Sequence, residues 1–354
     1  MPGKSASQLR ILFSPLDWGL GHAARLIPLI RAYKAKGYKI ILGGNGNSLE
    51  LLKIEFPELE TVSIPFTEIR YGKGEKQLFI FLGGLFRLFN SFRREHRVLD
   101  TIISEKQIDL VISDNRLGLH SREAKCILLT HQIWLQMPKG WGMLELIANM
   151  FNHHYIRKFD ECWVVDSDKT PNLAGELSHP PITESIIRYI GPLSRFSGKR
   201  KEASKNIDIL VILGGPEPQR SILEELLKRQ ISESSLKAVI AGGTFNREGL
   251  ELHPDIQYIP YAGSDQLAEL INAADIIICR SGYSSVMDLV ALQHSAILIP
   301  TPGQPEQEYL AEYLSEKKYF LSYRQEEFEI NKAVEDWKKF EHKLPVIEFN
   351  QFPG

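Results

Sequence analysis

Cysteines and long apolar runs are scarce in this sequence, and both absences narrow the classes of protein it can belong to. Only three cysteines occur among 354 residues, each inside an apolar segment, so we expect reduced thiols rather than a disulfide framework. No stretch reaches the ~18 uninterrupted apolar residues of a membrane-spanning helix. Residues 1–10 are polar and the first apolar run is short, which is atypical of a signal peptide, and we therefore expect a cytoplasmic protein.

An excess of charge of either sign is also absent. Lysine and arginine number 42 against 44 aspartate and glutamate residues, which leaves a net charge of -2. Proteins that bind nucleic acids usually carry a basic surface, so a nucleic-acid partner is not expected. The hydrophobic content of 43% is near the globular average, and the length is sufficient for about two domains.

Short apolar, β-rich runs alternate with helical patterns along the chain, as is typical of parallel sheets covered by helices. Six strands are expected in the first half, at residues 9–14, 39–44, 61–66, 109–114, 126–130 and 161–166. The spacing of apolar residues predicts crossover helices over 23–36 and around 144–151. After the polar, basic stretch 194–206 the same alternation starts again.

These patterns predict an α/β protein with two Rossmann-like, doubly wound parallel-sheet domains that face each other across a cleft. We expect a first domain, a linker, a second domain and a C-terminal helix with a tail, at residues 1–190, 191–206, 207–325 and 326–354. Ligands of open parallel sheets lie beyond the carboxyl ends of the strands, so the active site is expected between the domains.

The loop after the first strand, SPLDWGLGHAAR, places Gly19, Gly21 and His22 at the start of a helix. The glycines permit a tight turn, and the helix N-terminus offers unpaired N–H groups to an anion or a polar substrate. A glycine-rich turn in which His22 only caps or packs is the alternative. The loop does not match the dinucleotide-binding fingerprint, because no G-x-G-x-x-G follows and the second strand ends without an acidic residue.

Residues 255–314 carry the most specific pattern in the chain. It consists of Ala274-Asp275 before an apolar strand, Arg280-Ser281-Gly282 after it, an acid at Asp288, and a proline-led loop from Pro300 to Gln307. This order and spacing resemble the nucleotide-sugar-binding region of glycosyltransferases with the GT-B fold, especially family 28. The resemblance implies a GT-B fold, a nucleotide-sugar donor and transfer of its sugar to an acceptor hydroxyl.

The resemblance assigns the diphosphate to the segment after the apolar strand. Ser281 and Gly282 open a helix whose backbone amides can bind a pyrophosphate, and Arg280 lies beside them to neutralise its charge. An Arg280 paired with Asp275 would instead be structural. Asp288, in the same helix, matches the glutamate with which the family binds a ribose; a solvated helix carboxylate is the alternative.

Further donor contacts follow from the same resemblance. Glu306 and Gln307 match a loop that reads sugar hydroxyls, although a simple helix start is the alternative there. Ile259 and Tyr261 occupy the places where the family's backbone reads the base, so uracil, and with it a UDP-sugar, is inferred by analogy. Gly243, on a second loop of the same sheet edge, is expected to line the cleft.

The loop after the first strand of the second domain departs from the family's pattern. Gly214 and Gly215 would let the backbone approach the phosphates, but Pro216 and Pro218 remove amide donors. Arg220 would then supply the positive charge that the missing amides do not.

Candidate acid–base residues lie in the first domain. GLGH with His22 and LVISDNRLG with Asp114 resemble the plant UDP-glycosyltransferases, which pair a histidine and an aspartate at these places. A carboxylate that holds one imidazole nitrogen would raise the basicity of the other. Asp17 is the alternative orienting group or base, and His131, after another strand, is expected to contact the acceptor.

No metal or other cofactor is expected beyond the nucleotide-sugar substrate. The short Asp166-Ser167-Asp168 sequence matches a metal motif of another glycosyltransferase fold, but the nucleotide site argued above lies in the other domain. His153 and His154 are adjacent on a helix, face different directions and lack a suitably spaced third ligand.

The chain is therefore predicted to be an inverting, metal-independent glycosyltransferase. A nucleotide-sugar hydrolase or 2-epimerase of the same fold is one alternative, and a non-catalytic nucleotide-sugar-binding partner subunit is another. Such a subunit would not need a base in the first domain, so His22 favours an active enzyme.

An apolar helical stripe with a basic end is expected over residues 77–97. It contains Leu78, Leu82, Leu85, Phe89 and Phe92, with Arg87, Arg93, Arg94 and Arg97 near its end. Such a helix can lie at a membrane surface and be attracted by anionic headgroups. A lipid-linked acceptor and a place at the inner face of the membrane are expected on this ground; a stripe packed on the sheet and a soluble small-molecule acceptor are the alternatives.

Overall fold

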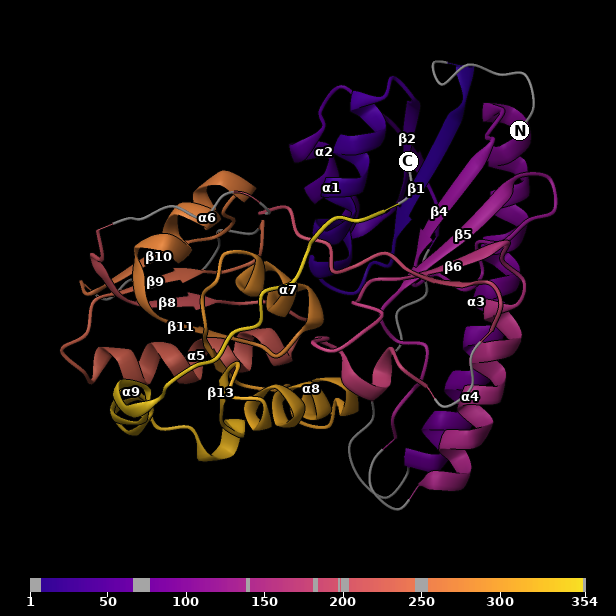
Figure 1. Cartoon of the computed structure of the whole chain (residues 1–354). Coiled ribbons are helices and arrows are strands. Elements are labelled where there is room, and N and C mark those ends of the chain that lie inside the picture. Colours follow the sequence, from indigo (N-terminus) through magenta and orange to yellow (C-terminus); the bar gives the residue numbers. More distant parts are fainter. Residues whose placement is uncertain are drawn as a thin grey trace.

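The structure is a computed structural model that describes residues 8–65, 77–137, 141–180, 184–196, 198, 204–245 and 254–352, with the backbone alone for 77–89. It contains two separate parallel sheets with helices packed on them, one in each half of the chain (Figure 1). The predicted α/β fold with two Rossmann-like domains is confirmed.

The first domain is built on a seven-stranded parallel sheet with the order β3-β2-β1-β4-β5-β6-β7. Its strands are β1 (Arg10–Pro15), β2 (Lys39–Gly44), β3 (Glu60–Ser63), β4 (Leu110–Asp114), β5 (Lys125–Thr130), β6 (Glu161–Val164) and β7 (Ile187–Tyr189). The register pairs Pro15 with Asp114, so the loops after β1 and β4 leave the sheet side by side.

Four helices accompany this sheet: α1 (Gly21–Ala35), α2 (Gly46–Glu55), α3 (Gln77–Lys106) and α4 (Gly142–Ile156). Helix α1 is buried along most of its length because it packs on both the sheet and α7 of the second domain. Helices α3 and α4 lie side by side at the right of Figure 1, with the rings of Phe92 and Tyr155 4.9 Å apart.

The second domain has a six-stranded parallel sheet with the order β10-β9-β8-β11-β12-β13. The strands are β8 (Ile207–Ile212), β9 (Ala238–Ala241), β10 (Ile256–Ile259), β11 (Ala274–Cys279), β12 (Ile297–Leu298) and β13 (Leu321–Ser322). Its helices are α5 (Gln219–Ser232), α6 (Ser264–Ala273), α7 (Tyr283–Ala291), α8 (Pro305–Glu316) and α9 (Ile330–Lys339).

The C-terminal tail runs back from α9 to the first domain (Figure 1). Asn350 anchors it: its backbone N–H donates to the carbonyl of Pro192 over 2.9 Å, and its side-chain oxygen accepts from the backbone N–H of Ser194 over 3.1 Å. The tail therefore bonds to the segment that joins the two sheets.

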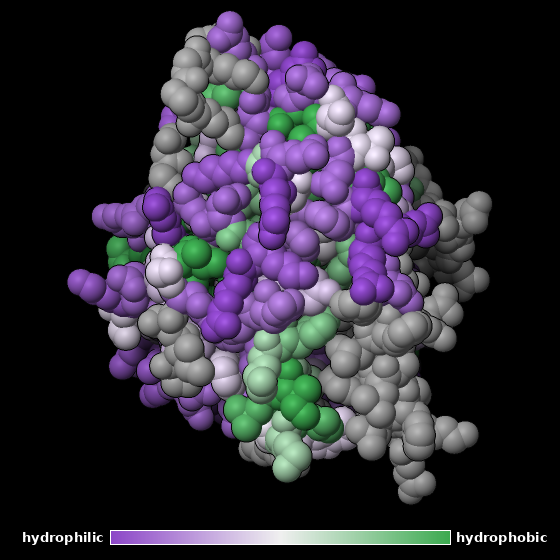
Figure 2. Space-filling view, turned by 90° about the vertical axis from the view of Figure 1, so that its right-hand side faces the viewer, coloured by the Kyte–Doolittle hydropathy of each residue, from purple (hydrophilic) through white to green (hydrophobic). Residues whose placement is uncertain are grey.

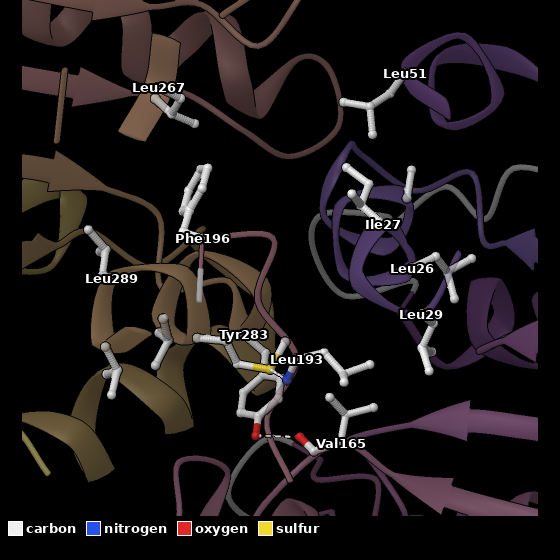
Figure 3. Close-up of a cluster of buried hydrophobic side chains, with 14 of the residues drawn as sticks. Leu26, Ile27, Leu29, Leu51, Val165, Leu193, Phe196, Leu267, Tyr283 and Leu289 are labelled. Carbon is white, nitrogen blue, oxygen red and sulfur yellow. Dashed lines mark hydrogen bonds between the residues drawn. The ribbon is translucent and has the colours of Figure 1, made fainter. Parts of the chain in front are cut away.

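One apolar core continues from the first domain into the second (Figure 3). Side chains of α1 and α2 lie on one side and side chains of α6 and α7 on the other; they include Leu26, Ile27, Leu29, Leu51, Leu267, Tyr283 and Leu289. Leu193 and Phe196 of the connecting segment lie between them. Burying each large apolar side chain contributes about 1.5–3 kcal/mol, and this burial holds the two domains together.

The predicted strands of both halves are found, with bounds that differ by at most three residues. Strands β7 and β13 and helix α2 were not predicted from the sequence. Strands of three and two residues are too short to show an alternation, and their places at the sheet edges come from pairing with neighbours.

Candidate active site

Glycine loops of the two domains meet at the domain junction. Gly19, between β1 and α1, has a φ of 86°, and a Cβ atom there would lie 3.6 Å from the backbone of Gly215 after β8. The hydroxyl of Ser284, in the first turn of α7, donates to the carbonyl of Gly21 over 2.9 Å. The N-termini of α1 and α7 therefore lie together, and both direct unpaired N–H groups toward the junction.

His22, in the first turn of α1, lies against an aspartate at the end of β4. Its Nδ1 atom is 3.2 Å from Oδ1 of Asp114, and the pairing of β1 with β4 determines this proximity. The Asp114 side chain is fully buried, whereas that of His22 is 15% exposed. The structure thus brings together the two residues that the sequence suggested as a pair.

A buried arginine completes this pair. Arg25 follows His22 by one helical turn, its side chain is 1% exposed, and it donates to both carboxylate oxygens of Asp114, with 2.7 Å from Nε to Oδ2. Burial alone would raise the pKa of Asp114, but the charges of Arg25 and His22 and their hydrogen bonds hold this pKa below its ordinary value. Asp114 is therefore an ionised carboxylate whose charge is balanced by a fixed guanidinium.

Two contacts compete for Nδ1 of His22. Oδ1 of Asp114 can only accept a hydrogen bond from it, whereas Nη2 of Arg25, 3.0 Å away, can only donate one. With a proton on Nδ1 the ring bonds to Asp114, and Nε2 can accept a proton. Without that proton the ring bonds to Arg25, and Nε2 is itself a donor. A general base at His22 requires the first tautomer.

A second histidine joins the two domains. His131, directly after β5, places Nδ1 2.9 Å from Nη1 of Arg25 and Nε2 2.9 Å from Oε1 of Glu306, in the first turn of α8. Burial lowers the pKa of His131, although the carboxylate of Glu306 acts in the opposite direction. For Glu306, burial would raise the pKa, but the interactions with His131, His22 and Arg25 outweigh it and lower this pKa.

Comparison with known proteins identifies the second domain. Residues 209–348 match the glycosyltransferase family 28 C-terminal domain. This chain is a glycosyltransferase whose second domain belongs to family 28. The UDP-N-acetylglucosamine--N-acetylmuramyl-(pentapeptide) pyrophosphoryl-undecaprenol N-acetylglucosamine transferase of Clostridium perfringens is 24% identical over 346 residues, which cover 91% of this chain and 88% of that protein. An uncharacterized glycosyltransferase of Methanopyrus kandleri is 22% identical, over 90% of this chain and 93% of the relative.

Solved structures show the same fold. MurG of Acinetobacter baumannii superposes with a TM-score of 0.53 and 12% identity, covering 94% of this chain and 90% of that one. The calicheamicin glycosyltransferase CalG4 gives a TM-score of 0.58 and 15% identity, over 93% and 89% of the two chains. The family 28-like glycosyltransferase therefore has the GT-B fold that its sequence led us to expect.

The family 28 domain holds a buried arginine just before α7. Arg280 is 3% exposed, and its burial lowers its pKa to about 10. It does not bond to Asp275; its guanidinium donates over 2.7–3.2 Å to the backbone carbonyls of Gln219, Ile299 and Pro300. Arg280 thus ties the start of α5 and the loop after β12 to the end of β11.

The next two residues form the start of α7. The hydroxyl of Ser281 donates to the carbonyl of Gln307 over 2.8 Å, which links the start of α7 to that of α8. Gly282 is the N-cap residue and has an extended backbone, and no described atom lies within 4 Å of the place that its Cβ would occupy. Space is therefore open beside the backbone of Gly282.

The carboxylate of Asp288 holds the segment that connects the domains. Its Oδ1 accepts from the hydroxyl of Ser194 over 2.6 Å, and its Oδ2 lies 3.3 Å from Nε of Arg195. Burial raises the pKa of Asp288, against the lowering effect of Arg195 and of the Ser194 hydrogen bond. The residue that the family resemblance assigns to a ribose is thus also a structural anchor.

The glycine loop after β8 has open backbone but balanced charge. No described atom lies within 4 Å of where a Cβ of Gly214 or Gly215 would be, so a ligand can approach this backbone. Arg220 forms ion pairs of 2.7 Å with both Glu217 and Glu224. Two carboxylates therefore already balance the positive charge that Arg220 was expected to supply to the phosphates.

The remaining predicted donor residues differ in accessibility. Gly243 has a φ of 61°, and a Cβ there would lie 2.5 Å from the carbonyl oxygen of Leu213, so only glycine fits this approach of two loops. The carbonyl of Ile259 accepts from the backbone N–H of Gly242 over 2.8 Å. The hydroxyl of Tyr261 is buried and lacks a hydrogen-bond partner within the described part of the chain.

Of the predicted sugar-reading pair, only Glu306 faces the first domain. The side chain of Gln307 is 6% exposed and bonds within its own loop, accepting from the backbone N–H of Thr301 over 2.9 Å and donating to Gln304 over 2.8 Å. The two neighbours in sequence therefore serve different purposes: Gln307 shapes the loop, and Glu306 crosses the junction.

Two acidic residues considered in the sequence analysis bind the protein's own backbone. Asp17 accepts from the backbone N–H of Ser48, in the first turn of α2, over 3.1 Å. Asp166 accepts from the backbone N–H of Leu173 over 2.9 Å and from the hydroxyl of Ser178 over 2.6 Å. Over the described ranges, no group of three or more His, Cys, Asp or Glu residues is arranged to hold a metal ion.

Apolar side chains gather on the outer surface of α4, in the lower part of Figure 2. We call Met143, Leu146, Ile147 and Met150 the α4 apolar face; they recur at helical spacing and are 51–79% exposed. In the stripe expected over 77–97, Phe92 is buried, whereas the other predicted apolar residues and Arg87 lie outside the described side chains. Arg93, Arg94 and Arg97 are exposed. No helix within the described residues is long and apolar enough to cross a membrane.

Three residues of the site, Arg25, Tyr283 and Ser284, were not predicted from the sequence. A signal for Arg25 was present, because a charged residue three positions after His22 shares its helix face in an otherwise apolar helix. Tyr283 and Ser284 had no comparable signal: their hydroxyls bond to backbone carbonyls of the other domain, and such partners leave no trace in the sequence.

Proposed function

We propose that this protein transfers a sugar from a UDP-sugar to an acceptor hydroxyl, with inversion at the anomeric carbon and without a metal ion. The observation that carries the proposal is the junction itself. The hydrogen bond from Ser284 to Gly21 places the start of α7 in the family 28 domain beside the loop that holds His22. The Clostridium perfringens relative is named for transfer from UDP-N-acetylglucosamine, which supports the class of donor.

The diphosphate of the donor binds at the N-terminus of α7 in this proposal. The backbone amides that follow Gly282 and the positive end of the helix dipole favour an anion there. Arg280 adds a positive charge that its carbonyl partners hold in place. Gly214 and Gly215 leave their backbone open to the same ligand. Together these groups stabilise the charge of the departing diphosphate without a metal.

His22 is the proposed general base. As the acceptor oxygen attacks the anomeric carbon from the face opposite the nucleotide, its proton passes to Nε2 of His22, and the new carbon–oxygen bond forms while the bond to the diphosphate breaks. The diphosphate leaves with the electron pair of that bond. Asp114, which accepts from Nδ1–H, holds the ring in the required tautomer and stabilises the imidazolium.

An acceptor at the membrane surface is part of the proposal. The α4 apolar face can enter the interfacial layer of a bilayer, and the exposed Arg93, Arg94 and Arg97 on the neighbouring helix α3 can contact anionic headgroups. The Clostridium perfringens relative is named for an undecaprenol-linked acceptor. We therefore propose that the acceptor is lipid-linked and that the protein works at the inner face of the membrane.

Calorimetric titration with a panel of UDP-, dTDP- and GDP-sugars tests the donor. We expect binding of a UDP-sugar and release of free UDP when an acceptor is present. If none of the panel binds, the proposal is wrong. Release of UDP without an acceptor indicates a hydrolase, conversion between two UDP-sugars indicates an epimerase, and binding without any turnover indicates a non-catalytic subunit.

Replacing His22 tests the base. We expect His22→Ala to lower kcat by about 10²–10⁴-fold, because general-base assistance is lost, and to leave the donor Kd unchanged. Turnover is measured by UDP release and the Kd by calorimetry. His342→Ala is the matched control, since His342 is exposed and lies in the tail. A His22→Ala variant with normal kcat would remove His22 from the mechanism.

The membrane proposal is tested by sedimentation with anionic liposomes at low and high salt. A Met143→Ser/Met150→Ser double variant is expected to bind liposomes at least about tenfold more weakly, because about 0.8 kcal/mol is lost for each CH₂ no longer buried. Its stability should match the wild type, since both side chains are more than 70% exposed. Val346→Ser, at an exposed apolar residue far along the sequence, is the control. Equal binding by all three proteins would contradict the proposal.

A further inference from the structure

A continuous series of hydrogen bonds runs from the first domain to the second through one guanidinium and one imidazole. Arg25 bonds through Nε and Nη2 to Asp114 and through Nη1 to His131, and His131 bonds to Glu306. Asp114, Arg25 and His131 are all less than 5% exposed. Glu306 is the member that belongs to the family 28 domain, and its side chain is 22% exposed.

The series determines which nitrogen of His131 carries the proton. An arginine can only donate hydrogen bonds, so Nδ1 of His131 must be an acceptor. Burial favours the neutral ring, and its single proton is therefore on Nε2, from which it is donated to Oε1 of Glu306. The ring of Tyr283 stacks on the imidazole at a centroid distance of 4.3 Å and an interplanar angle of 3°, which fixes the plane of the ring.

In this arrangement one carboxylate oxygen of Glu306 accepts a hydrogen bond from His131, and the other is available to accept one from a ligand. Oε1 is held by His131, whereas Oε2 has no hydrogen-bond partner within the described residues. The carboxylate is ionised, because its interactions with His131, His22 and Arg25 outweigh the effect of burial on its pKa. An ionised, partly exposed oxygen in a fixed position is a strong acceptor for a hydroxyl group.

We propose that Arg25 and His131 are positioning residues that orient Glu306, so that its Oε2 accepts a hydrogen bond from a hydroxyl of the donor sugar. This inference rests on the proposed function and extends it: the sugar is recognised by the family 28 domain only while the first domain holds the carboxylate. The nucleotide part of the donor, bound at α7, does not depend on this series.

The test compares the affinity for UDP with that for UDP-N-acetylglucosamine, both measured by calorimetry. His131→Leu is expected to weaken UDP-N-acetylglucosamine binding by about tenfold or more, the effect of losing an oriented, charge-assisted hydrogen bond, and to leave UDP binding within about twofold. His131→Gln supplies one acceptor and one donor in a similar place, and should restore sugar binding to within about threefold of the wild type. Thermal unfolding establishes that each variant is folded.

Glu306→Ala and His342→Leu complete the design. The Glu306 side chain is partly exposed, so Glu306→Ala is expected to fold even if His131→Leu does not. Glu306→Ala should show the same loss of UDP-N-acetylglucosamine affinity that is expected of His131→Leu. His342→Leu should match the wild type. The inference is overturned if His131→Leu and Glu306→Ala bind UDP-N-acetylglucosamine normally, or if both probes weaken equally. If the wild type binds neither UDP nor UDP-N-acetylglucosamine, the proposed function itself is wrong. That outcome is seen with the wild type alone and does not depend on the variants.

Discussion

The first and the second domain each contain a buried arginine, Arg25 and Arg280, and the two charges are compensated in different ways. Arg25 of the first domain forms a two-pronged ion pair with the buried Asp114. Arg280 of the second domain bonds to three backbone carbonyls, and within the described residues its Nε has no partner and no carboxylate forms an ion pair with it. The first charge is neutralised locally, and the second is not.

This difference suggests what each domain is suited to do. A neutralised arginine beside two histidines keeps the local potential close to balance, which suits a proton transfer at His22. A buried cation with only carbonyl partners leaves net positive charge where the backbone amides of α7 also point, which suits an anion. The asymmetry thus agrees with acid–base chemistry in the first domain and diphosphate binding in the second.

The largest expected effect is on stability and comes from removing the carboxylate of the buried Arg25–Asp114 pair. Asp114→Asn leaves Arg25 buried without its counter-charge, and we expect the free energy of unfolding to fall by about 3–5 kcal/mol. Urea unfolding followed by circular dichroism measures this change. Glu58→Gln, which breaks the exposed ion pair with Lys34, is the control and should leave the free energy of unfolding nearly unchanged, because solvent screens such pairs. Similar values for the two variants would show that the buried pair has no special role.

An intermediate effect, on the affinity for UDP, is expected from replacing Arg280. Arg280→Met should weaken UDP binding by about 10- to 100-fold and uridine binding far less, because the lost charge acts on the diphosphate. Arg229→Met is the matched control, since Arg229 is exposed in the last turn of α5, and it should change UDP affinity by less than about threefold. Both affinities are measured by calorimetry.

Arg280→Lys separates charge from scaffolding. Lysine keeps the positive charge but cannot reach all three carbonyls that Arg280 holds. We expect UDP affinity between that of the wild type and that of Arg280→Met. An affinity as low as that of Arg280→Met would mean that Arg280 acts by shaping the loops rather than by its charge.

The smallest expected effect is a change in how steeply the free energy of unfolding falls as the pH is lowered. Because the folded pKa of Asp114 lies below its ordinary value of about 3.9, the unfolded chain binds more protons as the pH falls through this region. The stability that Asp114 contributes is therefore present above about pH 4 and is lost as the pH falls toward the folded pKa. Urea unfolding between pH 6 and 3 should show a shallower decline for Asp114→Asn than for the wild type. Parallel declines would indicate that other carboxylates govern the acid transition.

Much of the architecture could be predicted because strand and helix periods are local. Runs such as that of β9 are apolar throughout, which indicates a strand buried on both faces, and glycine-rich turns mark the ends of several of them. The edge strands β7 and β13 were missed for the opposite reason. They are short and half-exposed, and only pairing with a neighbour makes them strands.

The candidate site was predictable only in part. His22 and Asp114 could be proposed together because parallel strands end at one sheet edge, and Glu306 because its loop resembles that of family 28. The balance of Arg220 by two acids was not foreseen, although Glu217 and Glu224 lie three and four positions away from it in sequence. Such spacing permits an ion pair on a helix without requiring one.

By itself, the sequence determined the two α/β domains and the family 28-like segment, because both depend on the spacing of residues along one stretch of chain. The tertiary structure decided which charges are compensated. Arg25 and Asp114 are 89 positions apart and His131 and Glu306 are 175 apart, so their pairing depends on strand register and on the packing of one domain against the other. Burial then determines their protonation, since a charge removed from water persists only where a partner is within hydrogen-bond distance.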